Sequence, residues 1–155
     1  MSGALGTFHL NSKFVAALQA KGIRLIVVGG LAVHHYCNER NVEDLDLLVE
    51  PTAHAGAAIV EVLVQFNDAA GFRPTDFARP RQHYGQKRAL YLDILTPYEE
   101  DDFDAMWARA NAANLNGVPV RVAAASDLLV MKRRAFAERS DEKDRSDIAL
   151  LQAVV

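Results

Sequence analysis

The amino-acid sequence predicts an α/β (α+β) fold, in which a mixed central sheet of about four or five strands is flanked by helices. Runs of apolar and β-branched residues predict strands at 23–28, 44–50, 88–96 and 118–122. Helical spacing of apolar residues predicts helices at 11–22, 31–37, 52–64, 99–110, 128–137 and 145–154, and Ser126 is the predicted cap of the helix at 128–137. Asn116-Gly117 is a strong hairpin signal and places a further short strand before residue 118.

The chain is predicted to form a single domain over its 155 residues, a length that allows one hydrophobic core. We expect residues 1–10 to be loosely ordered and residues 71–84, which are polar and contain prolines, to form an irregular loop. Residues 124–155 are expected to form a C-terminal helical part.

Composition and charge narrow the functional classes. A net charge of −3 gives no electrostatic reason to expect broad binding to nucleic acid. The sequence has no run of the roughly 18 apolar residues that span a membrane, and its N-terminus does not resemble a signal peptide. The single cysteine, Cys37, fits a reducing compartment. We therefore expect a soluble, cytoplasmic protein with no membrane partner.

The stretch from residue 25 to residue 50 combines two features of a phosphate and metal site. Gly29 and Gly30 follow a strand and precede a helix, so backbone N–H groups there can approach a phosphate closely. On the next strand Asp44 and Asp46 are two residues apart and therefore lie on the same face. Paired carboxylates repel each other, and oxygen ligands suit Mg²⁺ or Mn²⁺. The two acids also fit a solvated strand start, but the glycine turn upstream favours a site.

Asp93 is an acid in the middle of the otherwise apolar strand RALYLDILT. By itself it fits an exposed or edge position as well as a functional one. The acidic run of Asp101, Asp102 and Asp104 needs no chemical role, because acids at a helix start complement the helix dipole. The strand by itself therefore leaves both roles open for Asp93.

The order of strand, Gly29-Gly30, helix and Asp44-x-Asp46 on the next strand resembles the DNA polymerase β-type nucleotidyltransferase superfamily. Within it, the sequence is most similar to the minimal branch that includes abortive-infection and toxin–antitoxin nucleotidyltransferases. Many members of this branch read Arg-x-Thr-x-Asp-hydrophobic-Asp, and residues 40–46 match this pattern except at Val42. The Ser that usually follows the first glycine is also replaced, by Gly30.

The C-terminal part resembles the same branch, with a lysine inside a helix, a charged turn and a terminal helix. The matching residues are Lys132, Lys143, Asp144 and Asp147. In the relatives this part packs beside the active site, and the lysine can approach the triphosphate. Lys132 also fits an ordinary lysine on a helix surface.

The resemblance implies an enzyme that moves a nucleoside monophosphate from a nucleoside triphosphate (NTP) to an acceptor hydroxyl. It implies Asp44, Asp46 and Asp93 as catalytic residues and as ligands of Mg²⁺ or Mn²⁺ in a two-metal carboxylate mechanism. The implied nucleotide-binding residues are Gly29, Gly30, Arg40 and Lys132. The resemblance also implies a possible homodimer, since small relatives often dimerise.

The acceptor remains open among a small molecule, a partner protein and a tRNA end, and the acidic charge favours the first two. Residues of the irregular loop are candidates for acceptor contacts: Arg79, Arg81, His83 and Tyr84. His34 and His35 fit a packed or surface role better than a nucleotide contact. The alternative function is a catalytically weak nucleotide- or partner-binding module of a toxin–antitoxin system, which the missing hydroxyls favour and the three carboxylates oppose.

Overall fold

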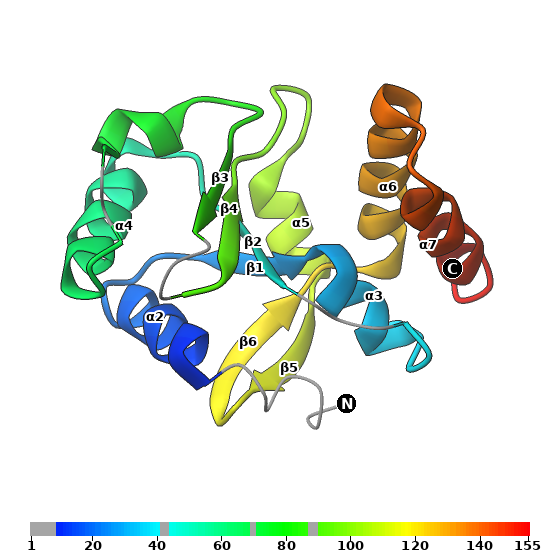
Figure 1. The fold of residues 1–155 in the computed structure, drawn as a ribbon, viewed down its shortest axis with the longest axis horizontal. Coiled ribbons are helices and arrows are strands. Elements are labelled where there is room, and N and C mark those ends of the chain that lie inside the picture. Colours follow the sequence, from blue (N-terminus) through cyan, green and yellow to red (C-terminus); the bar gives the residue numbers. More distant parts are fainter. Residues whose placement is uncertain (1–8, 41–43, 69–70, 87–89) are drawn as a thin grey trace.

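The computed structural model describes residues 9–40, 44–68, 71–86 and 90–155. In this part of the chain one mixed sheet of six strands runs through the centre of the molecule, in the order β3-β4-β2-β1-β6-β5 (Figure 1). The strands are β1 Leu25–Val28, β2 Leu45–Val49, β3 His83–Gln86, β4 Leu92–Leu95, β5 Asn111–Leu115 and β6 Val118–Val122. The predicted α/β class is confirmed, and the sheet is larger than the expected four or five strands.

The central strands place acidic residues next to one another. β1 and β2 pair antiparallel, with Val28 opposite Asp46. β2 and β4 pair parallel, with Asp46 beside Asp93. β1 is parallel to β6, and the edge strands β3 and β5 are antiparallel to their neighbours. Asp46 therefore lies on a central strand, between the end of β1 and Asp93.

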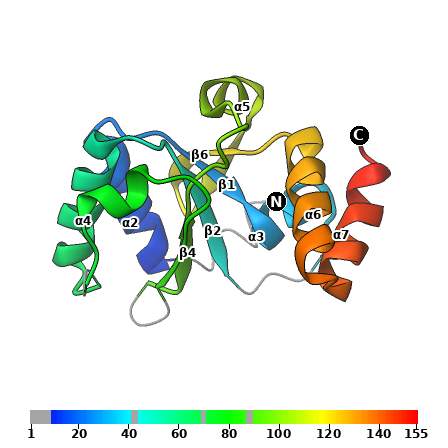
Figure 2. The same cartoon turned by 90° about the horizontal axis from the view of Figure 1, so that it is seen from above.

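Helices cover both faces of this sheet. Figure 2 shows α2 (His9–Ala20) and α4 (Ala53–Gln65) on one side, and α3 (Gly29–Tyr36), α6 (Ala125–Arg139) and α7 (Glu142–Gln152) on the other. Helix α5 (Phe103–Arg109) lies near one end of the sheet. None of the helices within the described ranges is both long enough and apolar enough to cross a membrane.

The hydrophobic core is continuous between the sheet and the helices. Its largest side chains are fully buried, and each contributes about 1.5–3 kcal/mol: Phe14, Leu18, Ile26, Leu31, Leu45, Leu47, Leu48, Ile59, Leu63, Phe77 and Leu90. The apolar stripe that predicted α2 and α4 is the face that these helices bury, since Phe14, Leu18, Ile59 and Leu63 are all members of this core. This packing holds the sheet rigid beneath the polar residues that follow.

The prediction of an irregular loop over 71–84 is wrong. This segment contains a 3₁₀ helix, η1 (Pro74–Ala78), and the start of β3. Phe72, Phe77 and Tyr84 form an aromatic cluster with ring centres 4.9–5.6 Å apart, which orders a segment that is polar in sequence. The strand predicted over 88–96 is shorter than expected, because β4 covers only Leu92–Leu95 and 87–89 lie outside the described residues.

Several helix boundaries also differ from the prediction. Residues 1–10 are predicted to be loosely ordered, but α2 already begins at His9. α3 begins at Gly29 instead of residue 31, because the positive φ of Gly29 turns the chain directly from strand into helix. Ala124, not Ser126, is the N-cap of α6. Asp141 caps α7, which begins three residues before the predicted position.

Candidate active site

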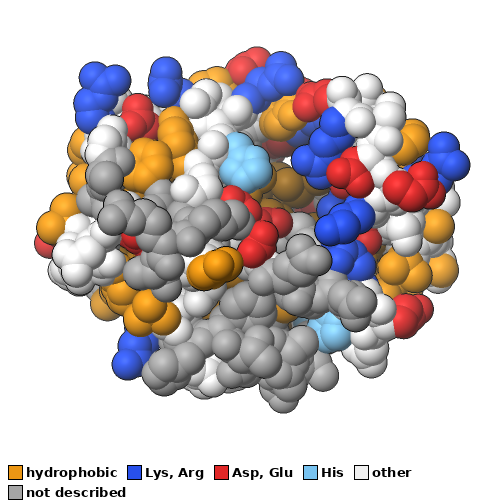
Figure 3. Space-filling model, in the orientation of Figure 1, with side chains coloured by type: hydrophobic (Ala, Val, Ile, Leu, Met, Phe, Trp, Pro, Cys, Tyr) orange, Lys and Arg blue, Asp and Glu red, His pale blue; other side chains and the backbone are white. Residues whose placement is uncertain are grey.

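A cleft of about 550 Å³ lies between strands β2 and β4 and helix α6, a size suited to a small-molecule substrate. Figure 3 shows a hollow on the face seen in Figure 1, with acidic side chains on one side of it and basic side chains on the other. All of the site residues predicted from the sequence border this cleft: Gly29, Gly30, Arg40, Asp44, Asp46, Asp93 and Lys132.

The acidic side of the cleft is built on two neighbouring strands. Asp46 on β2 lies beside Asp93 on β4 because the two strands are parallel and pair at these residues. Burial, a hydrogen bond with Asp93 and the charge of Asp93 raise the pKa of Asp46 to about 7, while Lys132 acts in the opposite direction. Two like charges held together favour uptake of a proton. Near neutral pH the Asp46–Asp93 pair therefore lacks enough cations nearby, among the residues that the structure describes, to balance two negative charges.

Asp44 and His83 extend the acidic side. Asp44 precedes β2 by one residue and borders the same cleft as Asp46, as expected from alternation along a strand. His83 on β3 places its Nε2 atom 3.3 Å from Oδ1 of Asp93. The His83 side chain is 60% exposed, so a substrate in the cleft can reach it.

Position 29 requires glycine for two reasons, its backbone conformation and the closeness of Asp46. Its φ of 69° is in the left-handed region, which a side chain disfavours. A Cβ atom at this position would overlap Oδ2 of Asp46. The glycine thus lets the start of α3 lie directly against the acidic pair, and the first N–H groups of a helix have no partner within it.

Arg40 occupies the space beside Gly30. A Cβ atom on Gly30 would lie 3.0 Å from Nη2 of Arg40, tighter than ordinary contact. The guanidinium therefore stands next to the first turn of α3, where a side chain at position 30 would otherwise be. This brings a positive charge to the helix end that favours anions.

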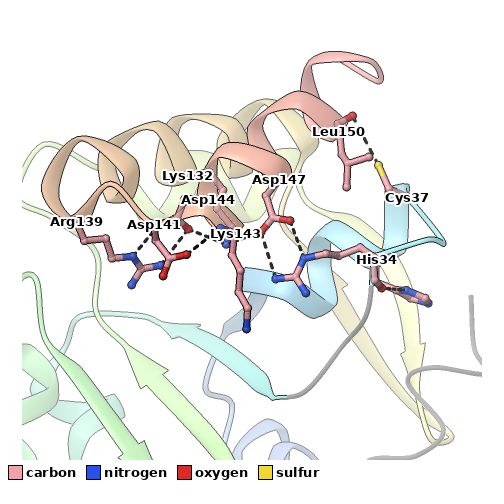
Figure 4. Close-up of polar contacts among 10 residues, drawn as sticks. His34, Cys37, Lys132, Arg139, Asp141, Lys143, Asp144, Asp147 and Leu150 are labelled. Carbon is pink, nitrogen blue, oxygen red and sulfur yellow. Dashed lines mark hydrogen bonds and ion pairs between the residues drawn. The ribbon is translucent and has the colours of Figure 1, made fainter.

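The basic side of the cleft is built by three cations, and two aspartates of α7 hold them (Figure 4). Asp144 accepts two hydrogen bonds from Arg139, of 2.7 and 3.0 Å. Asp147 accepts two from Arg40, of 2.6 and 3.3 Å. Nζ of Lys132 lies between the carboxylates, 3.4 Å from Asp144 and 2.9 Å from Asp147. We call these five residues the α7 ionic cluster.

Burial makes the α7 ionic cluster unusual. Asp144 and Asp147 are both 0% exposed. Burial would raise the pKa of Asp144, but the hydrogen bond from Arg139 and the charge of Lys132 outweigh it and lower that pKa below its ordinary value. Lys132, whose side chain is 12% exposed, is thus not an ordinary surface lysine.

A third set of residues, grouped around Tyr98, also borders the cleft. The Tyr98 ring lies between two guanidinium groups, 4.4 Å from that of Arg81 and 3.9 Å from that of Arg134. The Tyr98 hydroxyl donates to Glu138 at 3.0 Å. Asp101 accepts two hydrogen bonds of 3.0 Å from Arg134, so this acid is paired with a cation of α6.

The loop residues proposed for acceptor binding divide into two groups. Arg81 and His83 border the cleft. Arg79 and Tyr84 are not among the residues that line it: Arg79 lies 3.4 Å from Asp76, and the Tyr84 hydroxyl donates to the Asp76 carbonyl at 2.9 Å. These two residues stabilise η1, so their assignment to the acceptor is not supported.

The two histidines after the glycine turn have packing roles. Nδ1 of His34 donates to the carbonyl of Arg40 at 2.6 Å, which fixes the backbone of the residue that lies beside Gly30. The His35 ring packs edge-on against Tyr36, with ring centres 4.7 Å apart. This agrees with the packed role expected for both.

Sequence reasoning missed most of the cleft residues grouped around Tyr98. Tyr98, Arg134 and Glu138 were not singled out as site residues, although Arg134 and Glu138 are four residues apart on one helix and therefore share a face. Arg139 was also missed, and its spacing of seven from Lys132 places both on the same side of α6. These spacings were the available signal.

The acidic residues fit a divalent cation in their chemistry. Among the residues that the structure describes, no group of three or more His, Cys, Asp or Glu side chains is close enough to hold a metal ion as it stands. Asp44, Asp46 and Asp93 nevertheless share one cleft and supply the oxygen donors that Mg²⁺ or Mn²⁺ prefers. The raised pKa of Asp46 indicates where positive charge is lacking.

Comparison with solved structures finds the same architecture in an antigenic nucleotidyltransferase-like protein from Paracoccidioides brasiliensis. The TM-score is 0.63 with 18% sequence identity, over 99% of this chain and 78% of that protein. No protein-family model and no curated protein matches the sequence. At this level of identity the likeness concerns the fold, and the chain has a nucleotidyltransferase-like α/β fold.

Proposed function

We propose that this chain is a metal-dependent nucleotidyltransferase that moves a nucleoside monophosphate from an NTP to an acceptor hydroxyl. One observation carries the proposal: the Asp46–Asp93 pair, the glycine turn at Gly29 and the α7 ionic cluster all border a single cleft. Cations suit the triphosphate, and carboxylates suit the divalent ion that accompanies it. The two sides of the cleft thus fit two parts of one substrate.

The triphosphate would lie between the start of α3 and the basic side of the cleft. N–H groups at Gly29 and Gly30 would donate to phosphate oxygens. Arg40 and Lys132, which already lie at this wall, would balance the charge that develops on the leaving pyrophosphate. No rearrangement of the sheet is needed, because Gly29 leaves room for the backbone beside Asp46.

In the reaction, the acceptor oxygen forms a bond to the α-phosphorus as the bond from that phosphorus to the α,β-bridging oxygen breaks, and pyrophosphate leaves. A carboxylate oxygen of Asp93 takes the hydroxyl proton, and His83 at 3.3 Å orients that carboxylate. Mg²⁺ or Mn²⁺, held by Asp44, Asp46 and Asp93, would neutralise phosphate charge and favour ionisation of the acceptor.

We further propose that the chain belongs with the minimal, abortive-infection and toxin–antitoxin type of nucleotidyltransferase, on the pattern of residues 40–46. A small molecule or a hydroxyl of a partner protein is favoured as acceptor over tRNA, because the chain has a net charge of −3. A homodimer is proposed on the same resemblance.

A nucleotide-binding module with weak turnover is the second candidate. Gly30 offers no hydroxyl to a phosphate, and Arg40 fills the space that a side chain there would need. This observation favours binding over catalysis. The intact acidic pair opposes it, because clustered carboxylates cost stability unless they are used.

The test is the melting temperature with each NTP, with and without Mg²⁺, for the wild type and for Asp44→Ala. Ligand that binds only the native state raises the melting temperature. We expect a Mg²⁺-dependent rise with one NTP or more, absent in Asp44→Ala and retained in Asp104→Ala, whose acid is 78% exposed and outside the cleft. Release of pyrophosphate then separates the enzyme from the binding module, and no rise with any NTP contradicts both.

A further inference from the structure

Asp144 and Asp147 have no place in the reaction, yet both are completely buried acids that pair with the cations of the cleft. Both lie on the same face of α7, three residues apart, with 0% exposure. A buried carboxylate is costly unless it is paired and hydrogen-bonded. Here each accepts a two-pronged bond from an arginine and shares Lys132 with the other.

The cations of the α7 ionic cluster come from separate parts of the chain. Arg40 lies in the segment after α3, whereas Lys132 and Arg139 lie on α6. Their head groups would repel one another without the two carboxylates, which place one arginine on each side of the lysine. Figure 4 shows this row along α7, with Lys143 extending away from it on the same helix.

The charges of this cluster do not cancel. Three cations meet two carboxylates, which leaves one positive charge in excess within the cluster. Arg40, Lys132, Arg139 and Asp144 border the cleft, whereas Asp147 does not. A polyanion in the cleft would therefore meet all three cations of the cluster but only one of its two carboxylates.

We infer that Asp144 and Asp147 are positioning residues: they fix Arg40, Lys132 and Arg139 as a preformed site for a polyphosphate, so that its affinity depends on the last helix of the chain. The inference rests on the proposed function, because it names the part of the donor that this wall binds. Side chains that are already held in place lose little conformational freedom when a polyphosphate binds. The two carboxylates would strengthen binding by holding the cations in this way.

Two physical effects oppose each other here, so the sign of the result is informative. An aspartate that only neutralises the cations weakens anion binding, and its removal strengthens binding. An aspartate that positions them strengthens anion binding, and its removal weakens it. Rigid two-pronged geometry and complete burial favour positioning.

The experiment measures binding of inorganic tripolyphosphate by calorimetry in EDTA, so that the acidic side of the cleft and its divalent ion play no part. Asp147→Asn keeps the shape of the side chain and is expected to weaken binding about 10- to 100-fold, the usual range for a supporting residue. Asp144→Asn is the second variant, because its arginine partner is 59% exposed and the fold depends on it less.

Asp127→Asn is the matched control. Asp127 lies on α6, is 13% exposed and accepts two bonds from Arg109, but neither residue borders the cleft. Its removal should lower stability without changing tripolyphosphate affinity. In a Lys132→Met background, Asp147→Asn should lose part of its effect, because it acts through that lysine.

Each outcome decides the matter. Unchanged or tighter binding by folded Asp147→Asn and Asp144→Asn overturns the inference, as does an equal loss in Asp127→Asn. Absence of tripolyphosphate binding by the wild type also overturns it, even if nucleotide transfer is observed. If the wild type binds tripolyphosphate and the variants do not, the inference holds even where no pyrophosphate release is found, and only the proposed enzyme fails.

Discussion

Both sides of the cleft contain a pair of aspartates, but the surroundings shift the pKa of Asp46 in one pair and of Asp144 in the other in opposite directions. On the sheet side, Asp46 and Asp93 lie side by side, and burial together with their mutual repulsion raises the pKa of Asp46. On the helix side, Asp144 and Asp147 are buried more completely, yet the pKa of Asp144 is lowered because cations surround it. The carboxylates of the sheet side repel each other, whereas those of the helix side are paired with cations of the protein.

This difference distinguishes aspartates that would act directly on a ligand from aspartates that hold other side chains in place. A group that costs stability in the absence of ligand is expected to be used when the ligand binds. A group that is satisfied internally acts through its neighbours. Substitutions on the two sides should therefore change activity and stability in different combinations.

The largest effect is expected for Asp46→Asn. Nucleotide transfer should fall by about 10²–10³-fold or more, the usual cost of removing one electrostatic group from a site. The free energy of unfolding without divalent ions at pH 8 should instead rise by about 1–2 kcal/mol, because a repulsive charge is removed. Pyrophosphate release and urea denaturation measure the two quantities.

Asp104→Asn is the matched control for this substitution, since Asp104 is 78% exposed and outside the cleft. It should leave transfer near the wild-type rate. An Asp46→Asn protein that is less stable than wild type, or that retains full transfer, would contradict the assignment of the sheet side to chemistry.

The opposite side should respond in the opposite direction. Asp147→Ala removes a buried partner from both Arg40 and Lys132 and should lower the free energy of unfolding by about 3–5 kcal/mol. Glu142→Gln, which breaks an exposed pair with Arg145 at 3.8 Å on the same helix, should cost less than about 0.5 kcal/mol. Equal costs for the two variants, in chemical denaturation, would show that α7 is not held by its buried acids.

Sequence reasoning reached the sheet side of the cleft more fully than the helix side, for a physical reason. Gly29, Asp44 and Asp46 lie within one strand–helix–strand unit, so residues close together in the sequence carry the signal. Asp93 could be found because an acid in an apolar strand is conspicuous. The strand register that places it beside Asp46 depends on long-range pairing, which the sequence does not display.

The helix side depends on tertiary packing throughout. The sequence pattern includes Lys132, Asp144 and Asp147, but nothing local shows that the acids are buried or that Arg40 joins them from another part of the chain. The same limitation hid β3, whose polar residues pair with β4 because aromatic side chains nearby hold the segment in place. The type of an element could be predicted where its periodicity was strong. Its partners in strand pairing and in side-chain contacts could not.

The glycine turn joins the two sides and gives a smaller, matched test. Gly29→Ala should lower the free energy of unfolding by about 2–4 kcal/mol, because it combines a left-handed φ with overlap on Asp46. Gly30→Ala combines no left-handed φ with its contact, which lies 3.0 Å from Nη2 of Arg40, and should cost less, about 1 kcal/mol. Thermal denaturation of the two variants makes the comparison, and a greater cost at position 30 would argue against the described turn.

The smallest effect is the pH dependence of the sheet side. A carboxyl group whose pKa is raised to about 7 binds a proton in the folded state that the unfolded chain, with its pKa near 3.8, does not bind at neutral pH. The folded state therefore holds more protons, and stability falls as pH rises through 7. Between pH 6 and pH 8, without divalent ions, the loss should be about 1.4 kcal/mol.

Comparison with Asp46→Asn isolates this contribution from that of the histidines, because the variant keeps them all and should lack the 1.4 kcal/mol slope. Mg²⁺ should act most strongly at pH 8, where it competes with fewer protons for the same oxygens. The stabilisation by Mg²⁺ in denaturation experiments should thus grow from pH 6 to pH 8 in the wild type and be absent from the variant. A pH slope shared by both proteins would assign the titration to another group and would remove the electrostatic contrast between the two sides of the cleft.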